Sequence, residues 1–313
     1  MAYRLDPEEP LHAGAGRIVR DEVEGALAEL DAGSHERDTR VHRARRHLKR
    51  ARAVLRLVRP GSGPPLVHLD RQLRDAARLV ATTRDAAVAV QAFDAVRERF
   101  PDETDWPAFR LVRTGLVLRH RSLILSTVTA GRIDDLRSEL EHTRRTMTPW
   151  APGAGGFEAI APGLAATYRS GRVGMAAAYR RPSAERFHDW RRHVRYHALH
   201  AALLRGGCGR VAESRIKRAG RLAETLGVEH DLSVLGALLV ERPARFGGPA
   251  AVFPLLDLIE RRRAELRAVA RPAGKRLFRA RPAHVVDRFG QRWADRPGRG
   301  ATSGTGFRRT VAA

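Results

Sequence analysis

The sequence predicts an all-α protein of two pseudo-symmetric helical bundles, and three observations lead to this prediction. Apolar residues recur at the period of a helix along most of the chain, and no run alternates between apolar and polar residues. Capping residues and clusters of Gly and Pro divide this pattern into segments of helical length. The basic pattern that starts at His42 recurs at His188, an offset of 146 residues. This recurrence indicates an internal duplication, with halves expected at 1–148 and 157–295.

The composition indicates a globular protein that binds a polyanion. Hydrophobic residues make up 43% of the 313 positions, while the formal net charge is +23. Such a charge destabilises a compact state by self-repulsion, so it favours an anionic partner: nucleic acid, an anionic membrane or polyphosphate. The single cysteine, Cys208, excludes an internal disulfide, and the sequence shows neither a signal peptide nor a long apolar run. We therefore expect a cytoplasmic protein without a membrane anchor.

Five helices are predicted in the first half of the chain. The segment Pro60–Pro65, rich in Gly and Pro, ends the second of them. Asp85 follows a short polar loop, so we expect it to cap the fourth helix. The fifth helix is long, and a break is expected near Gly131. The predicted helices span about residues 12–30, 38–59, 66–80, 85–100 and 107–147.

The second half follows a linker rich in Gly and Pro at 149–156 and repeats the order of the elements. We expect its basic helix, at about 184–204, to end in a glycine turn at 206–209, and we expect Asp231 to cap a later helix. The Gly- and Arg-rich tail, 296–313, is predicted to be flexible. The remaining helices are expected at about 157–179, 211–226, 231–240, 251–281 and 284–293.

The helix predicted at 38–59 carries a basic stripe opposite an apolar band. The stripe spans about 80° of a helical wheel, and Arg43, Arg46 and Arg50 widen it. No carboxylate lies within residues 41–59, so no ion pair neutralises the stripe within the helix. We therefore expect the band to be anchored and the stripe to face an anionic partner. The stripe comprises His42, Arg45, Lys49, Arg52 and Arg56, and the band Val41, Ala44, Leu48, Ala51, Leu55 and Val58.

The second basic helix repeats the leading part of this stripe. Its corresponding residues are His188, Arg191, Arg192 and Arg195. A charged helix face is ordinarily a solvated surface, but recurrence at matched spacing favours a binding surface. Basic residues on neighbouring helices are predicted to widen the two surfaces: Arg17, Arg20, Arg74 and Arg78 in the first half, and Lys217 with Arg218 and Arg221 in the second.

The sequence offers little support for catalysis. It contains none of the motifs of P-loop enzymes, zinc proteases or serine hydrolases, and no alternating acids that would hold Mg²⁺ for phosphoryl transfer. Asp85 and Asp231 correspond in the repeat, but capping is favoured over a role as general base. His42 and His47 are too far apart around the helix to chelate one ion. We expect no metal, no cofactor and no enzymatic activity.

Five segments in a fixed order carry a family resemblance: YRLDPEEPL from Tyr3, VHRARRHLKRAR from Val41, RDAAV from Arg84, FHDWRRHVRYH from Phe187 and EHDLSVL from Glu229. With the repeat, they make residues 1–295 resemble one domain of the CHAD family, the conserved-histidine alpha-helical domains. The resemblance implies an all-helical fold with a basic central groove or cavity, and it implies binding of inorganic polyphosphate. Tyr196 departs from the pattern, since it stands where the first half has Arg50. The residues that match the family motifs are His42, Arg45, Lys49, Arg50, Arg52, His188, Arg191, Arg192 and Arg195.

The leading hypothesis is a non-catalytic, cytoplasmic protein that binds inorganic polyphosphate. A nucleic-acid-binding protein is the first alternative, but aromatic residues make up only 6% of the chain and no helix-turn-helix signature is present. A metal-dependent phosphohydrolase is less favoured, because the acids that it needs are missing. The expected partners are polyphosphate and polyphosphate-metabolising proteins, and the expected location includes polyphosphate granules.

Overall fold

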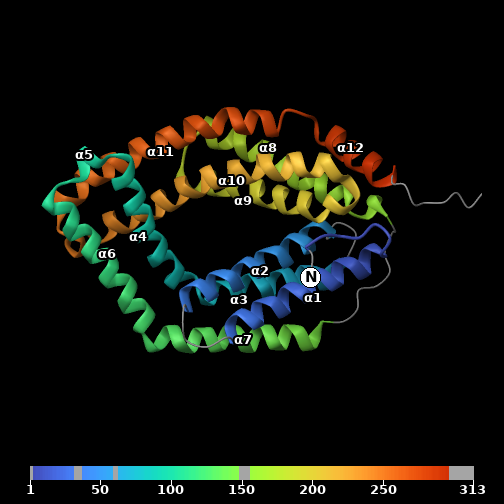
Figure 1. Cartoon of the computed structure of the whole chain (residues 1–313), viewed down its shortest axis with the longest axis horizontal. Helices are drawn as coiled ribbons and strands as arrows, with labels where there is room; N and C mark the ends of the chain where they lie inside the picture. Colours follow the sequence, from blue (N-terminus) through green and yellow to red (C-terminus); the bar gives the residue numbers. More distant parts are fainter. Residues whose placement is uncertain (1–2, 32–36, 59–62, 148–155, 296–313) are drawn as a thin grey trace, which may run out of the picture.

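The computed structural model describes residues 3–31, 37–58, 63–147 and 156–295, which form helices with no strand among them (Figure 1). This confirms the all-α prediction. The first helices are α1 (Leu11–Asp31), α2 (Arg37–Val58), α3 (Gly63–Leu79), α4 (Ala81–Arg99), α5 (Pro101–Thr104), α6 (Pro107–Leu125) and α7 (Thr127–Thr146). The later helices are η2 (Phe157–Ala159), α8 (Ala161–Arg180), α9 (Ala184–Leu203), α10 (Arg205–Glu241), η3 (Pro243–Phe246), α11 (Pro249–Leu277) and α12 (Pro282–Ala294).

The helices form two groups, which also connect through further helices at one end of the molecule. Helices α1, α2, α3 and α7 pack together in one group, and α8 to α12 pack in the other. Helices α4, α5 and α6 lie at the end where the groups join, on the left of Figure 1. Because α2 packs against both α8 and α9, the two basic helices α2 and α9 lie where the groups meet.

Two hydrophobic clusters hold the groups together. The larger joins α1, α2, α3 and α7 to α8, α9, α12 and the first part of α10. The smaller joins α4 and α6 to α11 and to the later part of α10, where Leu232, Leu235 and Leu239 are fully buried. Both clusters therefore combine helices from the two sequence halves. The duplication stays a prediction, and the linker at 149–156 (apart from Gly156) and the tail at 296–313 lie outside the described residues.

Neither Asp85 nor Asp231 caps a helix, so these two predictions were wrong. Val80 occupies the N-cap position of α4, and Asp85 lies inside that helix. Asp231 lies inside α10, which unites the two helices predicted at 211–226 and 231–240. The helix continues through this polar stretch because buried leucines on both sides of it keep one apolar face against the core.

The predicted glycine turn at 206–209 corresponds to a kink at Gly209, which interrupts the helical stretch of α10. Gly206 and Gly207 are helical, whereas Gly209 has a non-helical backbone, with φ of 42° and ψ of −125°, so α10 consists of two helical pieces on either side of it. A Cβ atom at Gly207 would overlap the indole ring of Trp293. Gly207 is therefore explained by the close approach of α12 to α10, and Gly209 by the positive φ at the kink.

The break between α6 and α7 falls at Ser126 rather than near Gly131. The backbone of Ser126 is extended, and its hydroxyl donates a hydrogen bond to the carbonyl of Leu123 at 3.0 Å. Gly131 lies inside α7, because an exposed glycine weakens a helix without obliging it to end. Helix α5 was not predicted. Helix α11 ends before the expected boundary at Arg281, since this residue precedes Pro282 and is extended.

We expect the protein to lose stability as the pH falls from 6.5 to about 4. Burial lowers the pKa of His200 from 6.5 to about 4, and burial also lowers the pKa of His197. In this interval the unfolded chain binds a proton that the folded chain does not, so the free energy of unfolding falls with decreasing pH. His200 alone should contribute a loss that approaches about 3 kcal/mol.

Urea denaturation across this pH range measures the effect. His200→Gln retains a donor for the carbonyl of Ala53, which accepts a hydrogen bond from His200 Nε2 at 3.0 Å. The stability of this variant should fall less steeply with acidification than that of the wild type. An identical pH dependence in the two proteins would contradict the assignment to His200.

Candidate functional site

One edge of the basic face of α2 is neutralised by carboxylates of α1. Glu22, which is buried, lies 2.6 Å from His47 Nδ1 and 3.7 Å from Arg50 Nη1. Glu29 lies 3.8 Å from Arg43 Nη1. The counter-charge that α2 lacks within its own sequence is therefore supplied in part by a neighbouring helix.

The other edge of this face contacts α3. Arg52 Nε donates a hydrogen bond to Asp70 at 2.7 Å, and Arg56 Nη2 lies 3.5 Å from the same carboxylate. Arg45 Nη1 donates to the carbonyl of Ala77 at 3.2 Å. The side chain of Arg52 is only 14% exposed, and removal of one member of such a buried pair is strongly destabilising. Arg52 therefore stabilises the fold, whatever it adds to ligand binding.

The remaining residues of α2 differ in how much of them reaches solvent. Arg46 is exposed, whereas His42, Lys49 and Arg56 are half-buried. One carboxylate, Asp70, faces both Arg52 and Arg56, so this part of the stripe keeps a net positive charge after pairing. The structure thus presents a partly neutralised basic edge where the sequence predicted a fully open stripe.

The predicted surface on α9 lies against α10. His188 Nδ1 is 3.3 Å from His230 Nδ1, and their ring centroids are 4.4 Å apart. Burial, with the charge of Arg191 as the next cause, lowers the pKa of His188. Arg192 is exposed and pairs with Asp189 at 3.1 Å. At neutral pH, His188 is therefore a neutral hydrogen-bonding group beside arginines.

The two basic helices meet at a contact that we call the α2–α9 junction, formed by Arg56, His193 and Tyr196. The guanidinium of Arg56 lies over the ring of Tyr196, 4.6 Å from its centroid. Burial lowers the pKa of His193, and the charges of Arg192 and Arg56 act in the same direction. Tyr196, which stands where the first half has Arg50, is thus a cation–π support for an arginine of the other helix. The junction brings the ends of both predicted surfaces together.

The residues predicted to widen the two surfaces differ in how far carboxylates balance their charge. Arg17 is engaged by Glu9, with Nη2 to Oε2 at 2.7 Å, and Asp75 pairs with both Arg74 and Arg78. These three arginines therefore carry less unbalanced charge than their sequence positions indicate. The other four residues are exposed: Arg20 on α1, and Lys217, Arg218 and Arg221 on α10.

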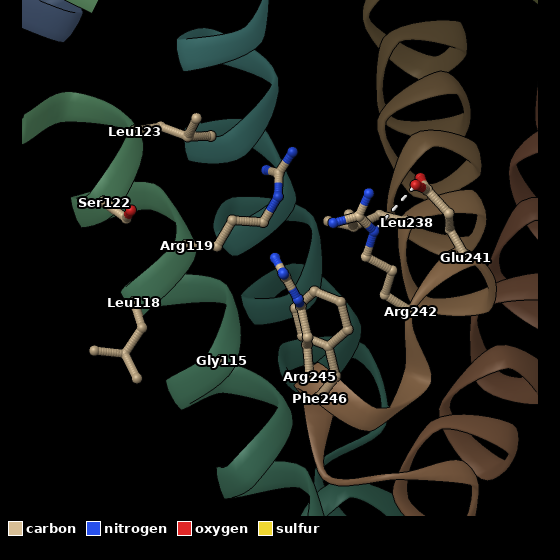
Figure 2. A pocket seen from close by; sticks show the side chains of 10 residues that line it. All are labelled: Gly115, Leu118, Arg119, Ser122, Leu123, Leu238, Glu241, Arg242, Arg245 and Phe246. Atoms are coloured by element: carbon tan, nitrogen blue, oxygen red, sulfur yellow. Dashed lines mark hydrogen bonds and ion pairs between the residues drawn. The ribbon is translucent and has the colours of Figure 1, made fainter. Parts of the chain in front are cut away.

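A cavity of about 600 Å³ between α6 and η3 brings together three arginines that sequence reasoning missed. Figure 2 shows that Arg119 of α6 points toward Arg242 and Arg245, which flank or lie in η3. Arg242 Nε donates to Glu241 at 3.2 Å. No helical period links these arginines, because they come from distant segments that only the fold brings together. Gly115 permits this close approach, since a Cβ there would lie 2.5 Å from the carbonyl oxygen of Arg245.

The fold and this distribution of charge define an all-helical protein in which two helices rich in arginine and histidine, α2 and α9, pack where the two groups of helices meet. A family model of the CHAD domain matches residues 17–240. This match spans more than half of the chain, so the protein belongs to the CHAD family.

Two solved structures support the same fold. The crystal structure of the CHAD domain from the plant Ricinus communis is 18% identical, with a TM-score of 0.58, and the match covers 90% of this chain and 95% of that chain. PptA from Streptomyces chartreusis is 16% identical, with a TM-score of 0.60, and the match covers 87% of this chain and 100% of that chain. No curated protein matches the sequence. Among the described residues, no helix is long and apolar enough to cross a membrane.

Proposed function

We propose that the protein binds inorganic polyphosphate, without catalysis, along the basic edges of α2 and α9. The observation that carries this proposal is the α2–α9 junction, where Arg56 of one helix stacks on Tyr196 of the other. Because the two surfaces meet there, one linear polyanion can contact both. Membership of the CHAD family supports the choice of ligand, since the family resemblance implies polyphosphate.

The chemistry of the surface suits a chain of phosphates. Guanidinium groups form paired hydrogen bonds with phosphate oxygens, and arginine is the main cationic residue of both helices. His188 and His193, whose pKa values are lowered, donate neutral hydrogen bonds at neutral pH. The residues that we assign to this surface are Arg45, Arg46, Lys49 and Arg56 of α2, with His188, Arg191, Arg192 and Arg195 of α9.

Nucleic acid is the alternative ligand with the same charge. Tyr196, the tyrosine of the α2–α9 junction, is buried under Arg56 and cannot stack on bases, which disfavours single-stranded nucleic acid. As partners and location that fit polyphosphate as the ligand, we propose polyphosphate-metabolising proteins and polyphosphate granules in the cytoplasm.

Competition at physiological salt between long-chain polyphosphate, duplex DNA and RNA tests the ligand. We expect polyphosphate to displace both nucleic acids, and its affinity to fall steeply with salt, by roughly one unit of log–log slope per neutralised phosphate, by analogy with DNA. Fluorescence anisotropy over a salt series measures both quantities. Equal affinity for random duplex DNA would favour the nucleic-acid alternative, and an affinity insensitive to salt would contradict the electrostatic account.

A further inference from the structure

A second basic surface lies on the far side of α10, between this helix, the end of α11 and α12. It is a cavity of about 900 Å³ lined by seven arginines, one histidine and three apolar residues, without a carboxylate. We call it the basic groove. Its arginines include Arg215, Arg218 and Arg221 of α10, Arg276 of α11, and Arg281 and Arg288 at the start and within α12.

Local structure explains how the groove forms. Arg215, Arg218 and Arg221 are three residues apart, so they follow one side of α10. Helix α11 ends at Leu277, and the extended Arg281 before Pro282 turns the chain into α12, which packs back on α10. The ends of two helices and the side of a third therefore surround one space.

Arg215, which is half-buried, forms the floor of the groove. Its Nη1 donates to the carbonyl of Leu277 at 3.3 Å and lies 3.5 Å from His197 Nε2, and its guanidinium lies 5.2 Å from the ring centroid of Tyr168. A cation at the C-terminal end of α11 is favoured by the helix dipole. Burial lowers the pKa of Arg215, and the positive charges of Arg288 and Arg218 act in the same direction. These two arginines are therefore close enough to Arg215 to repel its charge.

The charge of the basic groove is not balanced by the protein. Within the described parts of the chain, no carboxylate lies within ion-pair distance of its other six arginines. Arginines of α2 differ in this respect, since Arg50, Arg52 and Arg56 all face carboxylates. Converging cations without counter-charge repel one another, and a bound polyanion relieves this repulsion.

The groove is separate from the α2–α9 surface. A Cβ atom at Gly227 of α10 would lie 3.8 Å from the guanidinium of Arg191, so this side of α10 faces α9. Nine residues separate Arg218 from Gly227, which corresponds to about 180° around the helix. The two arginine clusters therefore lie on opposite sides of α10.

We propose that the basic groove is a second, independent binding site for a linear oligophosphate. A single phosphate carries about two negative charges and cannot balance seven guanidinium groups, whereas several linked phosphates can. No phenylalanine, tyrosine or tryptophan lines the groove, so these rings provide no platform there for the stacking of nucleobases. The inference rests on the proposed function only for the class of ligand, because it places that ligand on a different face.

Calorimetric titration of the full chain with a short linear oligophosphate tests the second site. The groove variant is Arg218→Gln, Arg221→Gln and Arg288→Gln; it leaves Arg215, which supports the end of α11, unchanged. The stripe variant is Arg191→Gln, Arg192→Gln and Arg195→Gln. The control for net charge replaces three exposed arginines, Arg97, Arg110 and Arg144, by glutamine. Thermal denaturation without ligand verifies that each variant is folded.

We expect the wild type and the control to show two classes of site. The groove variant should lose one class, with affinity there at least about tenfold weaker, and the stripe variant should retain it. A groove variant that titrates like the wild type would overturn the inference, whatever the stripe variant does. If the groove variant loses all binding while the stripe variant loses none, the inference stands and the proposed α2–α9 surface fails. Displacement of oligophosphate from the groove by an equal concentration of single-stranded oligonucleotide would overturn the assigned ligand class.

Discussion

Neutralising the first basic helix by Arg45→Gln, Arg46→Gln and Lys49→Gln should lower the affinity for long-chain polyphosphate by about 10²- to 10⁴-fold. A long chain that contacts α2 and α9 together makes its second contact within one complex, and this linkage raises apparent affinity without any new type of interaction. Loss of either surface removes the linkage. The equivalent variant of α9, with Arg191, Arg192 and Arg195 replaced, should therefore produce a similar loss, because its positions correspond at the offset of 146 residues.

The measurement is calorimetry of both triple variants against tripolyphosphate and long-chain polyphosphate. Tripolyphosphate should lose much less affinity than the long chain in either variant, because it is too short to bridge the surfaces. The variant with Arg97, Arg110 and Arg144 replaced controls for net charge. Arg52 is kept, since its pairing with Asp70 supports the fold. Equal losses for both ligands, or no dependence on chain length in the wild type, would show that the surfaces do not share one ligand.

The anchored side of α2 could be predicted from periodicity, and the structure confirms it. Val41, Ala44, Leu48 and Leu55 are at most 4% exposed, as expected for residues that recur every three or four positions. Periodicity reports which side of a helix faces the core, so it succeeds wherever one apolar band meets one core. Periodicity does not predict which residues of other helices lie beside the apolar band.

The carboxylates that hold the basic residues could not be placed from the sequence of α2. Glu22 and Asp70 belong to other helices, and only packing brings them to their arginines. The sequence nevertheless contains a signal for these two acids, because each of them interrupts the apolar face of its own helix. Glu229 follows the same rule: it is buried in α10 and binds Arg267 at 2.7 Å and Arg263 at 3.0 Å. An acid within an apolar band therefore indicates a buried ion pair with a neighbouring helix.

The predicted helix boundaries were wrong where a polar stretch lies between buried apolar residues of one helix. The stretch before Asp231 has the composition of a loop, yet leucines on both sides of it are buried against two clusters, so α10 continues. Composition describes local preference, whereas a helix of this length is stabilised mainly by tertiary packing. Sequence reasoning assigned Arg218 and Arg221 of the basic groove to the α9 surface for a related reason, since the groove arginines come from three helices whose meeting point no local pattern encodes.

Gly163→Ala should destabilise the protein by about 3 kcal/mol or more, the upper end of the range for overpacked positions. Gly163 lies in the first turn of α8, where a Cβ atom would overlap the backbone carbonyl oxygen of Leu57 in α2. A flexible side chain could rotate away from the new methyl group, but a backbone carbonyl cannot. The two helices must therefore separate, and they contact each other directly beside Arg56, so the α2–α9 junction would shift as well.

Urea denaturation compares this variant with Gly131→Ala, a glycine-to-alanine change at an exposed site in α7. No atom lies within 4 Å of a Cβ built at Gly131, so the control should gain up to about 1 kcal/mol from the better helix propensity of alanine. The opposite signs of the two changes separate the effect of close helix packing from that of propensity. If Gly163→Ala unfolds at the same urea concentration as the wild type, α8 does not press on α2 as closely as the structure indicates. A loss of polyphosphate affinity in Gly163→Ala under conditions where it remains folded is the further expected result, because the spacing of α2 and α9 sets the distance between the two basic surfaces.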